Sequence, residues 1–306
     1  MSEKRQVIVA PASGFCSGVQ LAIRRVKLTL EIYPGRRVVI DGELVHNRFV
    51  CEDLYRNGAY ILIDKKQGPF EIGVSEITQN DIVVIRAHGI SLERRKLIES
   101  LGCEIVDATC PLVRKIATII LSQRDRNILL LGDRQHEEVI GLRSYAPNVC
   151  VCGNLDEVQE LIESVRKRKK DVDQFGQFQP DLEWLLVCQS TLDLVLFNAV
   201  KTYLNEQHFS IHIFDTICAA TKLRQCGIER IFSCDAAIVI GGKNSANTRR
   251  LFENIRRNVD LVWWIESVDE INEISLNKFC KIGIAAGAST PPEQIIALKN
   301  KIEKIA

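Results

Sequence analysis

Short apolar runs alternate with longer amphipathic stretches along nearly the whole chain of 306 residues. The apolar runs predict strands at residues 6–10, 37–40, 82–85, 128–131, 149–152, 185–188, 236–240, 261–265 and 282–285. The amphipathic stretches predict helices at residues 18–33, 92–101, 112–120, 155–168, 192–204, 248–257 and 292–305. Strands that alternate with helices in this way form βαβ units, in which the strands are parallel. The pattern therefore predicts an α/β protein with mostly parallel sheets.

Polar residues gather directly after several of these strands. Ligands of open parallel sheets bind beyond the carboxyl ends of the strands, close to the first turns of the helices that follow. Imidazoles, hydroxyls, amides and backbone N–H groups are suitable hydrogen-bond donors to phosphate in such places. The residues concerned are His46, His88, His136, Ser190, Ser245, Asn247 and Ser289. We therefore predict a phosphate-bearing ligand at these strand ends.

Three cysteines occupy the same kind of position, each between a strand-like run and a helix-like stretch. They are Cys16, Cys110 and Cys218, and they divide the chain into three parts of similar length. We expect three parts of similar size, each contributing one cysteine from a strand-to-helix turn to one central site. The predicted domains are residues 1–106, 107–210 and 211–306.

These three thiolates could hold three corners of a 4Fe–4S cluster, which is normally bound by four cysteines. One iron would then stay open to a substrate oxygen, so the cluster could act as a Lewis acid and as an electron donor. Three cysteines could also bind zinc with one open position, or they could be unrelated buried thiols. Their spacing alone does not separate these interpretations.

The cysteines as a set indicate a reducing compartment. Their number, eleven, is odd, so a disulfide framework is not expected. The sequence has no Cys-x-x-Cys pair, which excludes a zinc ribbon and a thioredoxin motif. Cys150 and Cys152 are two positions apart, so on a strand both should face the same core. The first apolar stretch is too short for a signal peptide, and no apolar run is long enough for a membrane span. We expect a cytoplasmic protein.

Charge and local motifs narrow the range of partners. The formal net charge is +1 and the basic residues are scattered, so neither a nucleic-acid nor a membrane partner is expected. The polar segment 166–181, which begins Arg-Lys-Arg-Lys-Lys, is interpreted as a solvated helix end and a surface loop. The turn at 241–247 resembles a phosphate-holding loop without being a Walker motif, and no strand is followed by Gly-x-Gly-x-x-Gly. His208 and His212 have no polar cluster nearby and are interpreted as structural.

The motifs that carry these residues resemble those of the 4-hydroxy-3-methylbut-2-enyl diphosphate reductase family, which catalyses the last step of the non-mevalonate isoprenoid pathway. The matching segments are residues 14–19, 44–48, 87–89, 107–113 and 286–289, in the order found in the family. Together they are highly specific, whereas each alone would be a weak signal. The resemblance implies three α/β domains around a pseudo-threefold axis with an iron–sulfur cluster at the centre.

The resemblance also implies a role for each candidate residue. The three cysteines Cys16, Cys110 and Cys218 would be the cluster ligands, and Glu138 would relay protons. The diphosphate contacts would be His46, His88, His136, Ser190, Ser245, Asn247 and Ser289. Neighbouring side chains diverge by about 100° at a helix start, so we expect only one of Glu137 and Glu138 to face the site.

The implied reaction is a two-electron, two-proton reductive dehydroxylation that yields isopentenyl and dimethylallyl diphosphate. The cluster would pass on the electrons one at a time, and Glu138 would help to protonate the departing hydroxyl as water. A ferredoxin or flavodoxin would supply the electrons, because the chain has no nicotinamide or flavin fingerprint of its own.

The chain departs from the family pattern at several positions. Ser190 stands for the first of two paired threonines, Ala246 replaces a serine, Glu137 replaces a proline, and residues 10–13 read Ala-Pro-Ala-Ser. These changes leave open a related 4Fe–4S enzyme that acts on another phosphorylated or hydroxylated substrate. A non-catalytic iron–sulfur sensor is the other alternative. Glu138 and the three site histidines argue against a sensor, since a sensor needs neither a proton relay nor an anion pocket.

Overall fold

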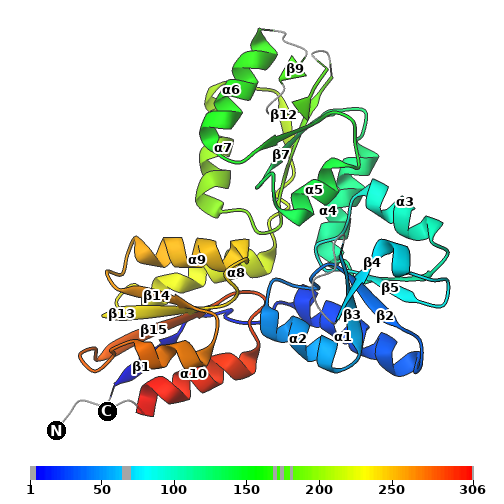
Figure 1. The fold of residues 1–306 in the computed structure, drawn as a ribbon. Helices are drawn as coiled ribbons and strands as arrows, with labels where there is room; N and C mark the ends of the chain where they lie inside the picture. Colours follow the sequence, from blue (N-terminus) through cyan, green and yellow to red (C-terminus); the bar gives the residue numbers. More distant parts are fainter. Residues whose placement is uncertain (1–4, 64–69, 168–170, 173–175, 180–181, 305–306) are drawn as a thin grey trace. The chain divides into compact units, whose positions relative to one another are not determined.

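The computed structural model confirms an α/β protein with three parallel sheets (Figure 1). It describes residues 5–63, 70–167, 171–172, 176–179 and 182–304. The chain forms two compact units. The first consists of Met1–Arg24, Val45–Asn57 and Ala219–Ala306, and the second of Arg25–Leu44 and Gly58–Cys218.

The first unit contains one four-stranded sheet, in which the N-terminal strand pairs with the last strand of the chain. The strand order is β1 (Gln6–Val9), β15 (Lys281–Ala286), β13 (Ala236–Ile240) and β14 (Val262–Ile265), all parallel. Helix α9 (Ala246–Arg256) covers one face and α10 (Pro292–Lys304) the other (Figure 1). Successive side chains of β13 face opposite sides of the sheet, so that both faces are apolar. Ile238 packs on the α10 side and Val239 on the α9 side.

The first sheet of the second unit has five parallel strands. Its order is β4 (Glu71–Gly73), β3 (Ala59–Ile63), β2 (Val38–Asp41), β5 (Ile82–Ile85) and β6 (Glu104–Asp107). All four residues of β2 and of β5 are buried, as expected for central parallel strands that are covered on both faces. Helix α3 (Leu92–Ser100) follows β5 and buries Ile98 against this sheet.

The second sheet of this unit is also parallel, in the order β12 (Ile211–Ile213), β11 (Trp184–Cys188), β7 (Asn127–Leu131) and β8 (Val149–Cys152). One face packs against α4 (Pro111–Ser122) and α5 (Glu137–Arg143), the other against α6 (Leu155–Arg166) and α7 (Leu194–Glu206). Cys150 and Cys152 both lie in the core on the α6 side, which confirms the prediction that they share one buried face.

The predicted strands and helices are present, with ends shifted by a few residues, and the structure adds several short elements. These are β3, β4, α2 (Arg48–Arg56), α5, α8 (Ala219–Gly227) and an antiparallel pair, β9 (Asp171–Val172) with β10 (Gly176–Gln177). The pair lies in the segment interpreted as a surface loop, part of which is outside the described residues. Residues 168 and 305, the predicted ends of two helices, are also outside them.

The topology places the polar loops of each sheet side by side. Strand β7, which leads to His136, pairs with β11, which leads to Ser190. Strand β5, which leads to His88, pairs with β6, which leads to Cys110. Because the strands are parallel, their carboxyl ends meet at one edge of the sheet. The ranges 1–106, 107–210 and 211–306 remain a proposal for the domain organisation, with β1 joined to the third sheet.

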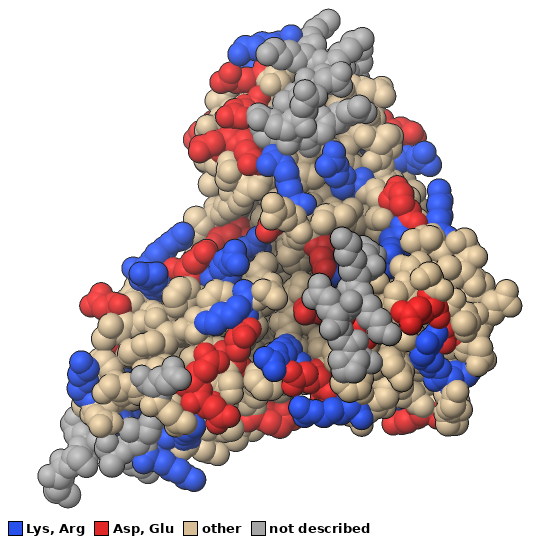
Figure 2. Space-filling view, in the orientation of Figure 1, with Lys and Arg blue, Asp and Glu red and all other residues tan. Residues whose placement is uncertain are grey.

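Acidic and basic side chains are interspersed over the face that Figure 2 shows. None of the helices in the described ranges combines the length and the apolar character that crossing a membrane requires.

Candidate functional site

The three predicted cluster cysteines have the same local structure. Each stands one residue before a helix: Cys16 before α1 (Ser17–Ile32), Cys110 before α4 and Cys218 before α8. Each is partly exposed, and each anchors its backbone N–H to a loop at a strand end. The acceptors are the carbonyls of Ala288 at 3.1 Å, Ala87 at 2.9 Å and Ser190 at 2.9 Å, respectively.

These anchors link each cysteine to a residue predicted to contact the diphosphate. Ala288 directly precedes Ser289, Ala87 directly precedes His88, and Ser190 is itself a predicted contact. The first of these links lies in the first unit, and the other two lie in the second unit. Within each unit, the structure therefore brings predicted cluster ligands and predicted substrate contacts together.

Other cysteines differ in their surroundings. Cys150 and Cys152 are completely buried. Burial raises the pKa of Cys150 to about 12 and also raises the pKa of Cys152. A thiol must be ionised to bind a metal, so these two are poor ligands. The partly exposed cysteines at helix starts are the suitable ones, since a helix N-terminus favours a negatively charged group such as a thiolate-held cluster.

Glu138 and Ser190 form the best-defined pair of the site. Glu138 is 1% exposed, in the first turn of α5. Its Oε1 accepts the backbone N–H of Ser190 at 2.6 Å, and its Oε2 lies 2.6 Å from the Ser190 hydroxyl. The carboxyl group is thus held in one orientation at the edge of the sheet, because both of its oxygens contact the same residue.

Neighbouring groups fix the loops on either side of this pair. The His136 side chain caps α5 by accepting the Glu138 N–H at Nδ1, over 3.1 Å. The buried Gln189 amide accepts the N–H of Asp133 at 3.0 Å and donates to the Thr191 hydroxyl at 3.0 Å. The turns that follow β7 and β11 are therefore joined by side-chain hydrogen bonds as well as by strand pairing.

A narrow pocket of about 40 Å³ opens beside Glu138 and His88. This volume is enough for one or two water molecules. The His88 and His136 rings meet edge to face, with their centroids 5.6 Å apart. Arg95, Asp107 and Arg114 also line the pocket, so its walls carry both signs of charge.

Asp107 orders the loop that carries Cys110. Its Oδ1 accepts the N–H of Thr109 at 3.0 Å, and Arg95 donates to its Oδ2 at 2.9 Å. Burial alone would raise the pKa of Asp107, but the hydrogen bonds from Thr109 and Arg95 outweigh it and hold the pKa below the usual value. The carboxylate is therefore ionised at neutral pH and stabilises the turn between β6 and α4.

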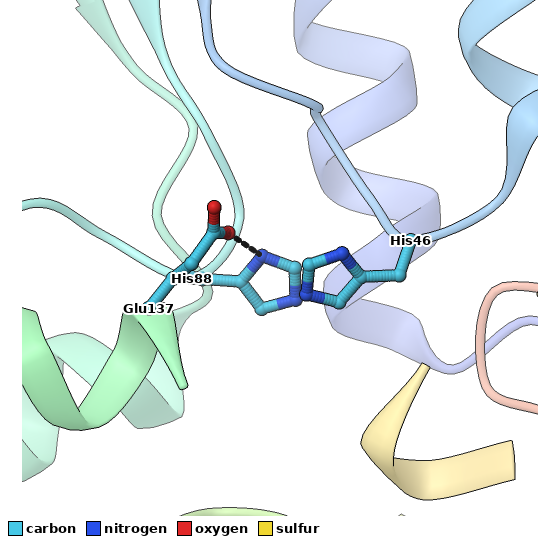
Figure 3. A group of neighbouring side chains, drawn as sticks. All are labelled: His46, His88 and Glu137. Carbon is cyan, nitrogen blue, oxygen red and sulfur yellow. Dashed lines mark ion pairs between the residues drawn. The ribbon is translucent and has the colours of Figure 1, made fainter. Parts of the chain in front are cut away.

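Glu137 also contacts a predicted site residue, contrary to expectation. Its Oε2 lies 3.6 Å from Nδ1 of His88, the contact drawn as a dashed line in Figure 3, and its Oε1 contacts the Arg86 guanidinium. The expectation that only one of the two neighbouring glutamates would face the site needs correction. Glu138 turns towards Ser190 and Glu137 towards His88.

The first unit gathers the other predicted substrate contacts. The Ser289 hydroxyl donates to the carbonyl of His46 at 3.0 Å. A Cβ placed on Gly242 would lie 2.5 Å from that same carbonyl oxygen, so only glycine fits there. Ser245 caps α9 through the N–H of Thr248. Asn247 is buried, and its side-chain nitrogen has no hydrogen-bond partner among the described residues. A buried amide donor of this kind at a helix start is suited to an anion.

His208 and His212 lie on the surface, away from these loops. The features that the sequence did not reveal are the Arg86–Glu137–His88 contacts and the Gln189 bridge. The only available signal for Gln189 was its position directly after a strand. The charge of Glu137 gave no signal of its own, because acidic residues are common in the first turns of helices.

The fold and the strand-end residues define a parallel α/β protein that carries thiols, imidazoles and hydroxyls at the carboxyl ends of its strands, where sheets of this kind bind ligands. Residues 7–303 match the family model described as LytB protein. The chain belongs to the LytB protein family.

Relatives and solved structures cover nearly the full chain. The 4-hydroxy-3-methylbut-2-enyl diphosphate reductase of Opitutus terrae is 34% identical, with 98% of this chain and 100% of the relative covered. The enzyme of the same name from Nitratidesulfovibrio vulgaris strain DP4 is 33% identical, with 98% and 99% covered. The structure of the E-1-hydroxy-2-methyl-but-2-enyl-4-diphosphate reductase from Plasmodium falciparum superposes with a TM-score of 0.83 at 26% identity, covering 97% of this chain and 88% of that one.

Some relatives are much longer than this chain. The Fusobacterium nucleatum protein named 4-hydroxy-3-methylbut-2-enyl diphosphate reductase is 32% identical over 98% of this chain, but the match spans only 34% of its own length.

Proposed function

We propose that this protein is a 4-hydroxy-3-methylbut-2-enyl diphosphate reductase. The overall reaction would combine the substrate with two electrons and two protons, break the bond between carbon and the hydroxyl oxygen, and release isopentenyl or dimethylallyl diphosphate and water. Membership of the LytB family and the names of its full-length relatives support the activity. The observation that carries the proposal is the buried Glu138–Ser190 pair, beside the His88 and His136 rings.

In this proposal, Glu138 and Ser190 deliver a proton to the departing hydroxyl. A protonated Glu138 can donate from Oε2 to the Ser190 hydroxyl, which can pass its own hydrogen on. The backbone N–H of Ser190 holds the other carboxyl oxygen at 2.6 Å, so the transfer needs no rearrangement of Glu138. A positioned general acid of this kind contributes about 10²- to 10⁴-fold to a rate.

The diphosphate would be bound by neutral and cationic donors from the strand-end loops. The proposed contacts are His46, His88, His136, Ser190, Ser245, Asn247 and Ser289. The Asn247 side-chain nitrogen, which has no hydrogen-bond partner in the described part of the chain, and the N-terminus of α9 supply donors in the first unit. The two imidazoles, which meet edge to face, supply donors in the second unit.

The proposed cofactor is a 4Fe–4S cluster bound by Cys16, Cys110 and Cys218. The donor set fits this cofactor, since all three are partly exposed thiols at helix starts and each is anchored by its own N–H. When bound, such a cluster supplies single electrons and a Lewis-acidic iron. A ferredoxin or flavodoxin as electron donor and a cytoplasmic location complete the proposal, and the eleven cysteines, all of them present as thiols, suit a reducing compartment.

Anaerobic purification followed by iron, sulfide and zinc analysis tests the cofactor. Turnover of (E)-4-hydroxy-3-methylbut-2-enyl diphosphate with a chemically reduced dye, with products resolved by mass spectrometry, tests the activity. We expect about four irons per chain and both diphosphate products. Zinc instead of iron would overturn the cofactor assignment, and an intact cluster without product would overturn the substrate assignment.

A further inference from the structure

The Arg86–Glu137–His88 cluster points to a residue that sets how His88 binds the diphosphate. We propose that Glu137 is a positioning residue: its carboxylate holds His88 with Nδ1–H towards Glu137, so that Nε2–H is presented to a diphosphate oxygen. The inference rests on the proposed function, because it concerns the ligand proposed for His88. The proline that the family pattern has at this position offers no such carboxylate.

The Glu137 carboxylate approaches the Nδ1 side of the His88 ring. Glu137 Oε2 lies 3.6 Å from His88 Nδ1, which is ion-pair range and slightly longer than a hydrogen bond. The other ring nitrogen of His88 points away from Glu137 (Figure 3). The side chains of both residues are largely shielded from water, with exposed fractions of 19% for His88 and 31% for Glu137.

Arg86 keeps Glu137 in place. Its guanidinium contacts the other oxygen of the Glu137 carboxylate, and it packs over Gly42 so closely that a Cβ there would lie 2.5 Å from Nη1. Gly42 adopts a φ of 78°, which glycine accepts readily. The Arg86 charge also offsets the Glu137 charge, so the pair does not repel an approaching diphosphate.

The protonation state of the His88 ring determines whether it can donate to Glu137 and to the diphosphate at the same time. Only the imidazolium form has an N–H on both ring nitrogens. A neutral ring that keeps its hydrogen on Nδ1 would present a lone pair to the diphosphate and would repel it. A carboxylate at Nδ1 stabilises the doubly protonated ring, and therefore preserves the Nε2–H donor to a higher pH.

Other charged and titratable groups also face His88 and bear on its protonation. They are His136, whose ring is 5.6 Å away, and Glu138, Arg95, Asp107, Arg114 and Tyr145, which line the same pocket. All of them remain when Glu137 alone is changed. The difference between wild type and a Glu137 variant therefore reports the loss of the carboxylate together with the release of its Arg86 partner.

The backbone conformation at Glu137 accepts two substitutions that remove the carboxylate. Glu137 is the first residue of α5, where proline is well accepted. The preceding residue, His136, has φ −73° and ψ 134°, the extended conformation that a following proline requires. Glu137→Pro should therefore fold, as should Glu137→Gln, and both remove the carboxylate. Asp156→Asn, in the first turn of α6, is the matched control for losing an acidic residue at a helix start.

The experiment measures binding of inorganic diphosphate to the cluster-loaded protein by calorimetry from pH 6 to pH 8.5. At pH 6, where a histidine is largely protonated in any case, we expect all forms to bind similarly. At pH 8, Glu137→Gln and Glu137→Pro should bind about tenfold more weakly than wild type, because a neutral ring can still donate from Nε2 but the hydrogen bond is no longer assisted by a charge. Imidazole ¹⁵N spectra, assigned with His88→Gln, should show Nδ1 of His88 losing its proton at lower pH in both variants. Asp156→Asn should follow wild type.

The outcomes separate this inference from the proposed function. Wild type that binds no diphosphate at any pH would overturn both. Wild type that binds, with Glu137 variants that have the same pH profile and the same His88 spectrum, would overturn the positioning role alone. A uniform loss of binding at every pH would indicate a structural effect of the substitution and would likewise overturn it.

Discussion

The backbone N–H of Cys218 donates a hydrogen bond of 2.9 Å to the carbonyl of Ser190, whose hydroxyl lies 2.6 Å from Glu138. One residue thus joins a proposed cluster ligand to the proposed proton relay. A change in the position of Cys218 is transmitted to Glu138 through two hydrogen bonds only. This coupling is the reason to measure cofactor content and turnover together in every variant.

The cysteine assignment predicts a selective loss of iron. Cys16→Ser, Cys110→Ser and Cys218→Ser should each lose most of the iron and all turnover, because a serine hydroxyl is a far weaker ligand than a thiolate. Iron analysis and the visible spectrum of anaerobically prepared protein measure the effect.

Exposed cysteines serve as controls for this loss. Cys226→Ser and Cys280→Ser change exposed thiols and should retain full iron and turnover. Full iron content in the Cys110→Ser variant would contradict the assignment.

The proton relay predicts a loss of rate without a loss of binding. Glu138→Gln should lower kcat by about 10²- to 10⁴-fold, the range for a general acid, with unchanged iron content. Ser190→Ala should cost about 10²-fold, since the Ser190 N–H still holds Glu138 while the relaying hydroxyl is gone.

Ser190→Thr is the control for the relay, because it keeps the hydroxyl and should turn over close to the wild-type rate. Steady-state kinetics with reduced dye distinguish the variants. Equal rates for Ser190→Ala and Ser190→Thr would show that the hydroxyl carries no proton.

Gly242 should tolerate no side chain. A Cβ would lie 2.5 Å from the His46 carbonyl oxygen, so Gly242→Ala must displace the His46 backbone, whose carbonyl accepts the Ser289 hydroxyl. We expect the free energy of unfolding to fall by about 1–3 kcal/mol, as in other overpacked sites, and diphosphate binding to weaken. Gly153→Ala is the control, because its added Cβ would meet nothing closer than 3.7 Å. Similar denaturant curves for both variants would refute the crowding argument.

We expect Asp81 to make a pH-dependent contribution to the free energy of unfolding. Burial alone would raise its pKa, but hydrogen bonds from Arg37 and Thr78 outweigh it and hold the pKa below the usual value. The stabilisation of the folded protein is then fully present above the pKa of an unfolded aspartate, about 3.9. It is lost as the pH falls through the lower pKa that Asp81 has in the folded protein. At pH 7, Asp81→Asn should cost about 2–4 kcal/mol.

Urea unfolding of wild type and Asp81→Asn at several pH values between 7 and 3 measures this difference. The difference in the free energy of unfolding between the two proteins should become smaller only below about pH 4. Asp125→Asn, which changes an exposed carboxylate, should track wild type throughout. A gap that stays constant down to pH 3 would mean that the Asp81 charge is not the source of the stability.

Periodicity predicted the strands that lie in the middle of sheets, because their residues are buried and apolar throughout, as in β5 and β13. It missed β4, Glu71–Gly73, a three-residue edge strand with a single apolar side chain, and α2, a nine-residue helix with four charged residues. The pairing of β1 with β15 was beyond local patterns, because such patterns do not specify which strands become neighbours.

The candidate site was predictable to a different degree at each residue. Glu138 and Ser190 follow neighbouring parallel strands, so their proximity follows from topology once the strand order is known. The role of Glu137 depends on the side chains of Arg86 and His88, which approach from another sheet. No local signal encodes that approach, so the contact became apparent only in three dimensions.

The pairing of Gln6 with Lys281 has a consequence for how the protein is made. On the ribosome, the second unit is complete as soon as Cys218 has emerged, so its two sheets can form while synthesis continues. The N-terminal strand, although made first, must wait for nearly the entire remaining chain before its partner exists. Until then its apolar residues Val7, Ile8 and Val9 have no sheet to join and stay exposed while the rest of the chain is made.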